Sequence, residues 1–386
     1  MDRRVYLAAR VRPLTPREMS MGSKTCIVVD GNCTTIVNPE TGDAKAFVLD
    51  YSYDSSDEAA SRRGMVEDDS GGDKAGCQAD NYTIFKDIGT AMLMSSLDGL
   101  NTCFFAHGQS GTGKTYTLIG EEADPGLLPR LLEALFQQDA VISGDLEISV
   151  KFIEVGNEQV RDMMQRDFYS PGGLRVRQRE GVGAVVEGLS ATALRSMSDC
   201  EDFLAEVLRS LGSIAVSSHS VFTIELFEPD PRGSSAKVPL SKMHLVDLAS
   251  SASSSDAGNL QMKSSATLQD RSLLAWANVM SALAENQMEE VSGRRPRVFV
   301  PYRGSVLTRV LEDSMGPRSR SFVVATLSPS HLEYRSTLNT FRHVVRAKEV
   351  RRVAPNDAIL RQYMGDQDLV PAAGGGWRWA YCPKDG

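Results

Sequence analysis

A glycine-rich octapeptide in the first third of the chain restricts the possible folds more than any other feature. Residues 108–115 read Gly-Gln-Ser-Gly-Thr-Gly-Lys-Thr and fit the pattern G-x-x-x-x-G-K-[ST]. In such a loop, backbone N–H groups surround the phosphates of a nucleotide, the lysine reaches the β and γ oxygens, and the next hydroxyl binds Mg²⁺. The apolar run at 103–106 predicts a buried strand before the loop, and a helix should begin at Lys114. A glycine turn that only links strand to helix is the alternative, but such a turn would not require the Lys-Thr pair.

The loop therefore predicts a site for ATP or ADP with Mg²⁺. Its candidate nucleotide ligands are Gly108, Gln109, Ser110, Gly111, Thr112, Gly113, Lys114 and Thr115. Thr115 is also a candidate Mg²⁺ ligand. Asp247, at the end of an apolar strand-like run, is the second candidate and would act through the metal's water shell, as Walker-B carboxylates do.

Composition places the chain among globular proteins. Of its 386 residues, 41% are hydrophobic and 24% are charged. We expect no membrane span, because no run of about 18 apolar residues occurs, and no signal peptide is visible. The six cysteines are scattered without a C-x-x-C pair, which argues for a reducing compartment and against zinc or a disulfide framework.

Strand-like and helix-like runs alternate along the chain and predict an α/β core with helices on both faces of a sheet. The clearest predicted strands are Val5–Val11, Thr34–Val37, Ala46–Tyr51, Asn101–Ala106, Leu146–Val155, Val221–Phe227, Met243–Leu248 and Ser321–Leu327. The predicted helices are Ile84–Leu97, Leu127–Phe136, Ser198–Leu211, Leu273–Ala284 and Ser305–Asp313. Residues 55–80 read as a long surface loop, and the chain from Gly365 reads as a tail without heptads.

Charge is distributed unevenly. The net charge is −8, yet residues 291–352 hold 13 Lys and Arg against 4 Asp and Glu. A basic segment on an acidic protein suggests a docking face for a polyanionic partner. Solvated helix faces that happen to be basic are the alternative.

Six segments, one of them leading into the glycine-rich loop, resemble the kinesin motor domain and occur in the order that kinesins show. They are Arg-Val-Arg-Pro at 10–13, Phe-Ala-His at 105–107, Gly-Leu-Leu-Pro-Arg at 126–130, Phe-Ile-Glu-Val-Gly-Asn-Glu at 152–158, Leu-Val-Asp-Leu-Ala at 245–249 and Pro-Tyr-Arg-Gly-Ser-Val-Leu-Thr-Arg at 301–309. His107 stands where kinesins usually have tyrosine. Residues 12–20, 50–53 and the loop at 55–80 look most like the axonal-transport (third) kinesin family, although that family's lysine-rich loop is absent from 285–297.

The resemblance implies a kinesin-type P-loop NTPase with a central mixed sheet of eight strands, paired both parallel and antiparallel, and helices on both faces. Residues 1–352 would form the motor domain and 353–386 a neck or tail segment without a coiled coil. Arg10 and Pro13 would flank the nucleotide base, with Tyr116 as a stacking surface. The residues expected to contact microtubules are Arg271, Arg294, Arg295, Arg297, Arg303 and Arg309.

Both kinesin switch motifs are altered. Where switch I reads N-x-x-S-S-R-S-H, residues 212–219 place Val216 at a serine and Ser217 at the arginine. Where switch II reads D-L-A-G-S-E, Ser250 replaces the glycine and Ala252 the glutamate. In kinesins that glutamate and arginine pair around the attacking water. Losing such a water-positioning group costs about 10²–10⁴-fold in rate, so we assign no catalytic residue. Takeover by Ser251 or Ser253 through water is the alternative.

These observations predict a microtubule-binding kinesin-like protein that holds ATP or ADP and hydrolyses ATP weakly or not at all, with a structural or regulatory role. An active ATP-driven motor is the rival, and a P-loop ATPase unrelated to microtubules fits fewer motifs. We expect a monomer, or a protein docked to other microtubule-associated proteins, in the cytoplasm and cytoskeleton, with an axonemal location left open. No nucleic-acid partner is expected.

Overall fold

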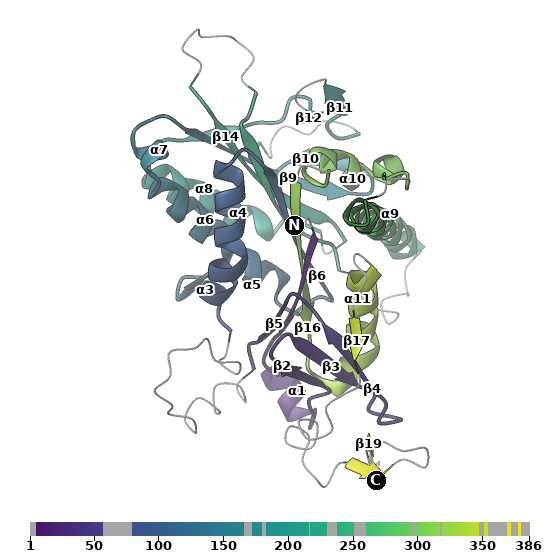
Figure 1. Cartoon of the computed structure of the whole chain (residues 1–386). Coiled ribbons are helices and arrows are strands. Elements are labelled where there is room, and N and C mark those ends of the chain that lie inside the picture. The colour runs from purple at the N-terminus through teal and green to yellow at the C-terminus, as the bar shows by residue number, and fades with distance from the viewer. Residues whose placement is uncertain are drawn as a thin grey trace.

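A twisted mixed sheet forms the centre of the protein (Figure 1). The computed structural model describes residues 5–56, 79–165, 172–179, 183–215, 217–229, 238–250, 260–293, 295, 298–316, 319–346, 351–353, 369–371 and 377–379. For residues 260–270, 291, 346 and 351 onward, the backbone alone is described. In this part of the chain, no helix combines the length and the apolar character needed to cross a membrane.

Eight strands of the sheet follow one another in the order β10-β9-β14-β15-β6-β16-β1-β5, and β13 also pairs with β9. Their bounds are β1 Val5–Val11, β5 Tyr51–Asp54, β6 Asn101–Gly108, β9 Glu147–Gly156, β10 Gln159–Asp162, β13 Thr192–Leu194, β14 His219–Phe227, β15 Ser241–Asp247 and β16 Ser319–Leu327. The five strands from β15 to β5 are parallel, and the β10-β9-β14-β15 half is antiparallel. The predicted mixed sheet is therefore confirmed.

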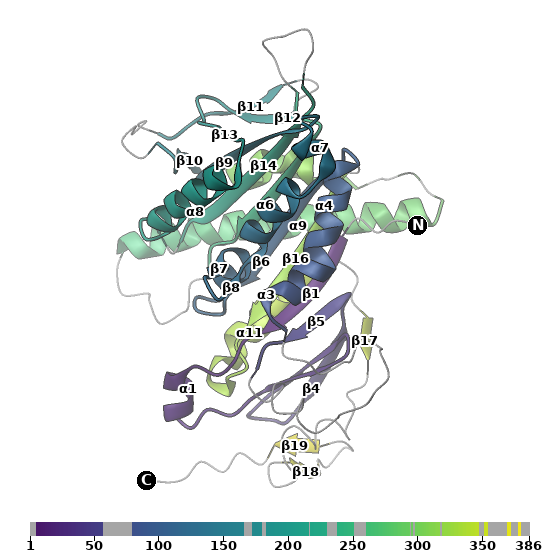
Figure 2. The same ribbon diagram turned by 90° about the vertical axis from the view of Figure 1, so that its left-hand side faces the viewer.

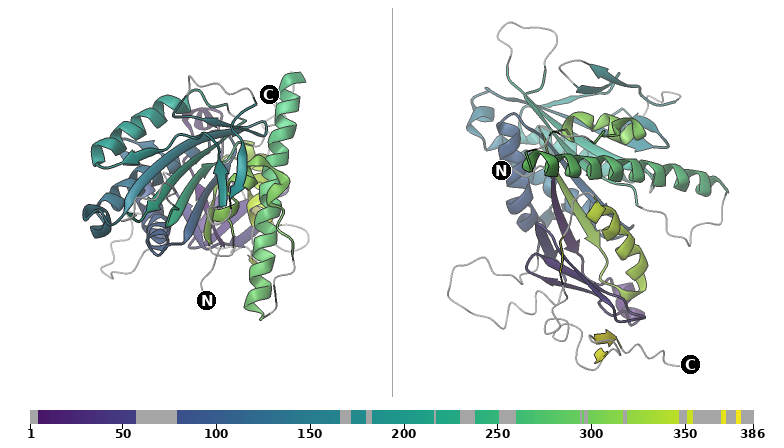
Figure 3. Two further views of the ribbon diagram at one scale, coloured as in Figure 1. Left: turned by 90° about the horizontal axis from the view of Figure 1, so that it is seen from above. Right: turned by 45° about the vertical axis from the view of Figure 1, so that its right-hand side comes forward.

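Helices cover both faces of this sheet. One face carries α3 Asn81–Ile84, η1 Phe85–Gly89, α4 Thr90–Leu97, α5 Lys114–Leu118, α6 Leu127–Phe136, α7 Asp139–Ile142 and α8 Met197–Leu211 (Figure 2). The other carries α9 Leu260–Val291, η2 Tyr302–Gly304, α10 Val306–Val310, η3 Glu312–Ser314, η4 His331–Glu333 and α11 Tyr334–Arg346 (Figure 3). Successive strand residues point to opposite faces, so Phe104 joins the core under α4, α6 and α8 whereas Phe105 packs under α9.

A smaller sheet extends from the β1 and β5 end of the molecule. Its order is β17-β4-β3-β2, with bounds β2 Ile27–Asp30, β3 Cys33–Val37, β4 Ala44–Val48 and β17 Arg351–Val353. Helix α1 Pro16–Ser20 lies beside it and starts with a Thr15–Glu18 capping box. Three hairpins complete the described fold: β7 Gly120–Glu121 with β8 Asp124–Pro125, β11 Val176–Arg179 with β12 Gly183–Val186, and β18 Leu369–Pro371 with β19 Trp377–Trp379.

Several predicted elements differ from the observed ones. The expected strand Ala46–Tyr51 is two strands, because at Asp50 the chain passes from the small sheet to the central one and the Asp50 carboxylate accepts the Leu7 N–H. The expected helix Leu273–Ala284 is part of the much longer α9. The expected helix Ser305–Asp313 breaks after Val310 into η3. Residues 57–78 of the expected surface loop lie outside the described residues.

A largely buried ion pair fastens η3 to the antiparallel half of the sheet. Lys242 Nζ on β15 lies 2.6 Å from Asp313 Oδ2, and His244 Nε2 lies 3.9 Å from Oδ1. Burial by itself would raise the pKa of Asp313, but His244 and Lys242 outweigh it and lower that pKa to about 2. The carboxylate therefore stabilises the fold in its charged form.

We expect Asp313→Asn to lower the free energy of unfolding by about 3 kcal/mol, because the buried ammonium of Lys242 would lose its ion pair with the Asp313 carboxylate. Urea denaturation measures this change. The double variant Lys242→Met with Asp313→Leu is the control and should recover most of the loss. Because the folded pKa lies below the unfolded one, the wild-type contribution should be present above about pH 4 and vanish toward pH 2. Equal stability of Asp313→Asn and wild type would contradict this role.

Candidate functional site

The glycine-rich loop connects β6 to α5 and is fixed against β16. A Cβ at Gly108 would lie 2.3 Å from Thr326 Oγ1, so only glycine lets the two strands approach this closely. Thr112 Oγ1 is 2.8 Å from Thr326 Oγ1 and donates to the Gln109 carbonyl at 2.7 Å. Gly111 and Gly113 have φ of +74° and +96°, which side chains rarely adopt, and a Cβ there would meet open space. The backbone is therefore exposed on one side, as phosphate binding by this loop requires.

Lys114 and Asp247 place opposite charges at the loop. Lys114 Nζ donates to the carbonyls of Gly108 and Gln109 at 3.0 and 3.1 Å and to Ser250 Oγ at 2.8 Å. Burial lowers the pKa of Lys114 and raises the pKa of Asp247, and in each case the other residue opposes the shift. Thr115 Oγ1 donates to Asp247 Oδ2 at 2.5 Å. The structure thus brings together the threonine and aspartate predicted to hold Mg²⁺, and this donor set of hard oxygen atoms fits that ion.

Arg10 is buried beside the loop rather than free at its surface. Its guanidinium donates to Ser55 Oγ at 3.2 Å, to Asn81 Oδ1 at 2.6 Å and to Thr117 Oγ1 at 2.9 Å. It also lies 5.1 Å from the centre of the Tyr116 ring. Burial lowers the pKa of Arg10. In the described structure Arg10 therefore supports Tyr116 from behind, and the ring is the surface on which a base could stack.

The sequence did not reveal Asn81 and Asp124, which bond to Arg10 and Tyr116 and fix their positions. Asn81 starts α3, and Asp124 in β8 accepts from the Tyr116 hydroxyl at 2.8 Å and from the Asn81 N–H at 3.1 Å. Pro13 follows β1 and is half-buried. Nothing in the spacing of Asn81 and Asp124 distinguishes them from other loop residues, because the contacts join segments far apart in the chain.

His219 links the altered switch segments to α9. Its Nδ1 accepts the Ala249 N–H at 3.0 Å, so the ring proton lies on Nε2 and is donated to Ser272 Oγ at 2.7 Å. Burial lowers the pKa of His219 to about 3 and keeps the ring neutral. Of the four altered positions, Ser217 and Ser250 are described, whereas Val216 and Ala252 lie outside the described residues.

His107 fills the space between the loop, α9 and α11. Its ring lies 5.7 Å from the rings of Trp276 and His343. Within the described part of the chain, neither ring nitrogen of His107 has a hydrogen-bond partner. Burial, with smaller effects from His343 and Lys114, lowers its pKa to about 3.

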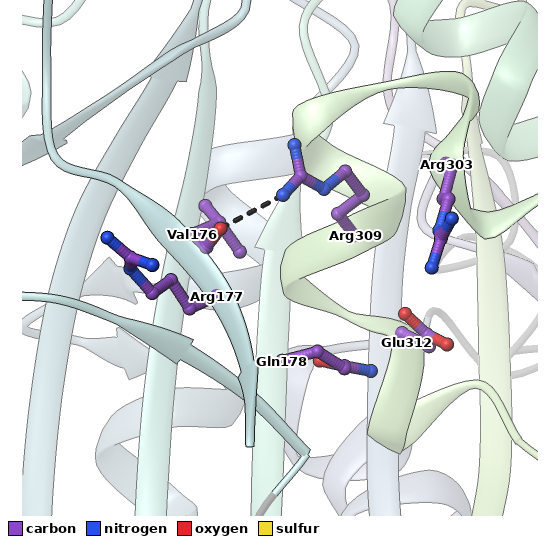
Figure 4. A pocket seen from close by; sticks show the side chains of 6 residues that line it. All are labelled: Val176, Arg177, Gln178, Arg303, Arg309 and Glu312. Atoms are coloured by element: carbon purple, nitrogen blue, oxygen red, sulfur yellow. Dashed lines mark hydrogen bonds between the residues drawn. The ribbon is translucent and has the colours of Figure 1, made fainter. Parts of the chain in front are cut away.

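Basic side chains from separate elements meet beside α10. Arg303 on η2 and Arg309 on α10 line a cavity of about 330 Å³ together with Val176, Arg177, Gln178 and Glu312 (Figure 4). Arg309 donates to the Val176 carbonyl at 2.9 Å. An adjoining cavity of about 340 Å³ adds Arg175. We call Arg175, Arg177, Arg303 and Arg309 the basic face.

The sequence prediction covered only half of the basic face. Arg175 just before β11 alternates with Arg177 and Arg179 on it, a spacing that marks one side of a strand and could have found them. Arg271 and Arg295 are exposed as expected, whereas Arg294 and Arg297 lie outside the described residues. The exposed stripe of α9 is nearly neutral. Its members from residue 271 onward are Arg271, Leu274, Asn278, Ser281, Glu285 and Met288.

The loop, the Thr115–Asp247 pair and the mixed sheet define a P-loop nucleotide-binding fold. The family model of the kinesin motor domain matches residues 10–350, and the chain belongs to that family. Mouse kinesin-like protein KIF16B is 34% identical over 90% of the chain, rat KIF1B is 35% identical over 96%, and human KIF1C is 36% identical over 93%. These matches confirm the predicted kinesin membership and associate the chain with kinesins of the KIF1 type.

The chain spans a third or less of the length of these curated relatives, at 27%, 21% and 33% of each. Solved structures of KIF14 agree with the fold. KIF14 with ADP in complex with a microtubule has a TM-score of 0.74 and 29% identity, covering 91% of this chain and 97% of that one. A KIF14 dimer with AMP-PNP in complex with a microtubule also gives 0.74, with 30% identity over 90% and 94%.

We expect His107→Phe to raise the free energy of unfolding by about 1 kcal/mol at neutral pH, because two unpartnered buried nitrogens disappear. Folded His107 stays neutral while the unfolded side chain takes up a proton below about pH 6.5, so wild type should lose stability as pH falls. Between about pH 7 and 5.5 the variant should lose about 1 kcal/mol less than wild type. Urea unfolding at both pH values tests this.

His107→Asn is the control at the same position, since it keeps polarity but does not titrate. It should reduce the acid dependence without the gain at neutral pH. An unchanged acid dependence in both variants would show that folded His107 binds a proton.

Proposed function

We propose that this chain binds a nucleotide and microtubules through a kinesin fold and hydrolyses ATP weakly or not at all. The observation that carries the proposal is a complete phosphate loop next to incomplete switch segments. Thr115 bonds to Asp247 and Lys114 bonds to Ser250, while Ser217 and Ala252 replace the arginine and glutamate of the family pattern. The role we infer is structural or regulatory.

The chain's own residues support nucleotide binding. Gly111 and Gly113 leave room for phosphate at the backbone, and Tyr116, supported by Arg10, offers a ring for the base. A bound Mg²⁺–nucleotide supplies the phosphoanhydride bond that hydrolysis would cleave. Lys114 would neutralise phosphate charge, and Thr115 with Asp247 would hold the metal. Without a carboxylate–guanidinium pair, the attacking water has no strong orienting group.

Microtubule binding rests on the basic face and on the family. The two KIF14 structures are described as complexes with microtubules, and we extend that partner to this chain as a proposal. Tubulin presents an acidic surface, which the arginines around the cavity of Figure 4 complement. Because the exposed stripe of α9 from residue 271 onward holds one arginine and one glutamate, the basic face would supply most of the attraction.

An active ATP-driven motor is the second candidate function, and the contacts that the switch segments retain favour it. The Thr115–Asp247 contact and the His219 link to Ala249 and Ser272 keep both switch segments tied to the loop and to α9. The two candidates differ in turnover rather than in binding, so a kinetic measurement separates them.

Mg-ADP should stabilise the protein against heat, by about 2.7 kcal/mol at a hundredfold excess over Kd. Lys114→Ala should abolish this shift, and Lys45→Ala, an exposed lysine on β4, should keep it. Phosphate release with saturating microtubules should stay well below the value of about 10 s⁻¹ that is typical of enzymes. Turnover at that rate would favour the active motor instead.

Arg177→Glu combined with Arg303→Glu should weaken co-sedimentation with microtubules about tenfold, since two attractive charges become repulsive. Both side chains are exposed, whereas Arg309 holds Val176 and its reversal would also disturb the hairpin. The wild-type affinity should also fall as salt rises.

Arg209→Glu is the matched control. Arg209 on α8 is exposed and pairs with Glu206 much as Arg177 pairs with Glu187, but it lies on the opposite face of the sheet. Its reversal should leave binding unchanged. Equal affinity of the double variant and wild type would exclude the basic face.

A further inference from the structure

Ser250 occupies a fixed position under the phosphate loop. After β15 the chain is held by two backbone bonds: the Leu248 N–H donates to the Ala106 carbonyl at 3.0 Å, and the Ala249 N–H donates to His219 Nδ1 at 3.0 Å. These bonds leave the next residue little freedom. Ser250 is 8% exposed, and its hydroxyl points at Lys114.

The Lys114 ammonium has three hydrogens and, among the residues that the structure describes, three protein acceptors. Two are the carbonyl oxygens of Gly108 and Gln109 in the loop itself, and the third is Ser250 Oγ at 2.8 Å. An ammonium carries three donors and no more. Any further oxygen that Lys114 binds must replace one of these three.

Ser250 Oγ takes one of the Lys114 donors that a phosphate oxygen would otherwise accept from. A separation of 2.8 Å falls within the range of about 2.7–2.9 Å for charge-assisted bonds between an ammonium and an anionic oxygen. In this type of loop the lysine reaches the β and γ oxygens. Because Ser250 is part of the chain, its hydroxyl competes with a phosphate oxygen for the same donor.

We propose that Ser250 is a specificity-determining residue that makes the pocket prefer a nucleoside diphosphate to a triphosphate. This inference rests on the proposed nucleotide binding. The β-phosphate would be held by the loop backbone around Gly111 and Gly113, where open space lies over the chain, and by one bond from Lys114 in place of a loop carbonyl. The γ-phosphate would need a second bond from the same lysine, and Ser250 Oγ accepts that bond.

The expected size of the preference for the diphosphate follows from the loss of one hydrogen bond between Lys114 and the triphosphate. Loss of a hydrogen bond to a charged group corresponds to about a 10- to 100-fold change in affinity. We therefore expect Mg-ADP to bind wild type about 10- to 100-fold more tightly than the β,γ-imido analogue of ATP.

Titration calorimetry with Mg-ADP and with the Mg-β,γ-imido triphosphate, on the full chain, tests the proposal. Ser250→Ala removes the hydroxyl and keeps the Cβ, and Ser250→Gly removes both. In each variant we expect the triphosphate analogue to bind at least about tenfold more tightly than it binds wild type, and the ADP affinity to change by less than about threefold. Ser96→Ala, a buried serine beside Thr102 at the start of β6 and therefore at the opposite end of that strand from the loop, should leave both affinities unchanged.

The outcomes are distinct. Equal wild-type affinities for the two nucleotides, or a ratio that neither Ser250 variant changes, would overturn the selectivity and leave nucleotide binding intact. Failure of both nucleotides to bind wild type would overturn the proposed function together with this inference. If Ser250→Gly unfolds at the assay temperature, Ser250→Ala decides, because the competing atom is the hydroxyl oxygen.

Discussion

A buried ammonium at the edge of the central sheet is the interaction on which the rest of the site depends. Removing Lys114 from water is unfavourable unless nearby groups replace the lost hydration. Two loop carbonyls and a serine hydroxyl do so, and Asp247 supplies the opposite charge. β6 and β15 are adjacent parallel strands, so their carboxyl ends bring Lys114 and Asp247 to the same edge. The order of the strands therefore determines both where the loop lies and which charges meet at the site.

The parts of this arrangement that are local in sequence could be predicted. The strand Val5–Val11 and the helix Leu127–Phe136 have the predicted bounds because turn residues or glycine delimit their apolar patterns. The loop and Asp247 carry their own motifs. The partners of Arg10 could not be predicted, since Ser55 and Asn81 come from distant segments and neither has a local signature. The length of α9 was missed because its first turns lack the apolar periodicity of the rest.

Helix α9 joins the two regions that the proposed function requires. On its buried side, Ser272 accepts from His219 and Trp276 packs against His107, both next to the phosphate loop. On its exposed side, Arg271 and Leu274 lie toward solvent. One rigid element therefore contacts the nucleotide region and the surface next to the basic face. Because the neutral His219 imidazole bonds to both Ala249 and Ser272, it would transmit a displacement of the switch segment at Ala249 to α9.

The substitutions in the switch segments leave the buried charges balanced. If a kinesin arginine alone had been lost, its glutamate partner would remain as an uncompensated charge, and such a loss is strongly destabilising. Here Ser217 and Ala252 remove both members, so the pair disappears without leaving an orphan. Ser250 also helps to satisfy the buried charge, because its hydroxyl is the third acceptor of the Lys114 ammonium and belongs to the protein itself. A site built this way does not need a phosphate to satisfy its lysine, so the fold can be stable without the arginine and glutamate of the kinesin pattern.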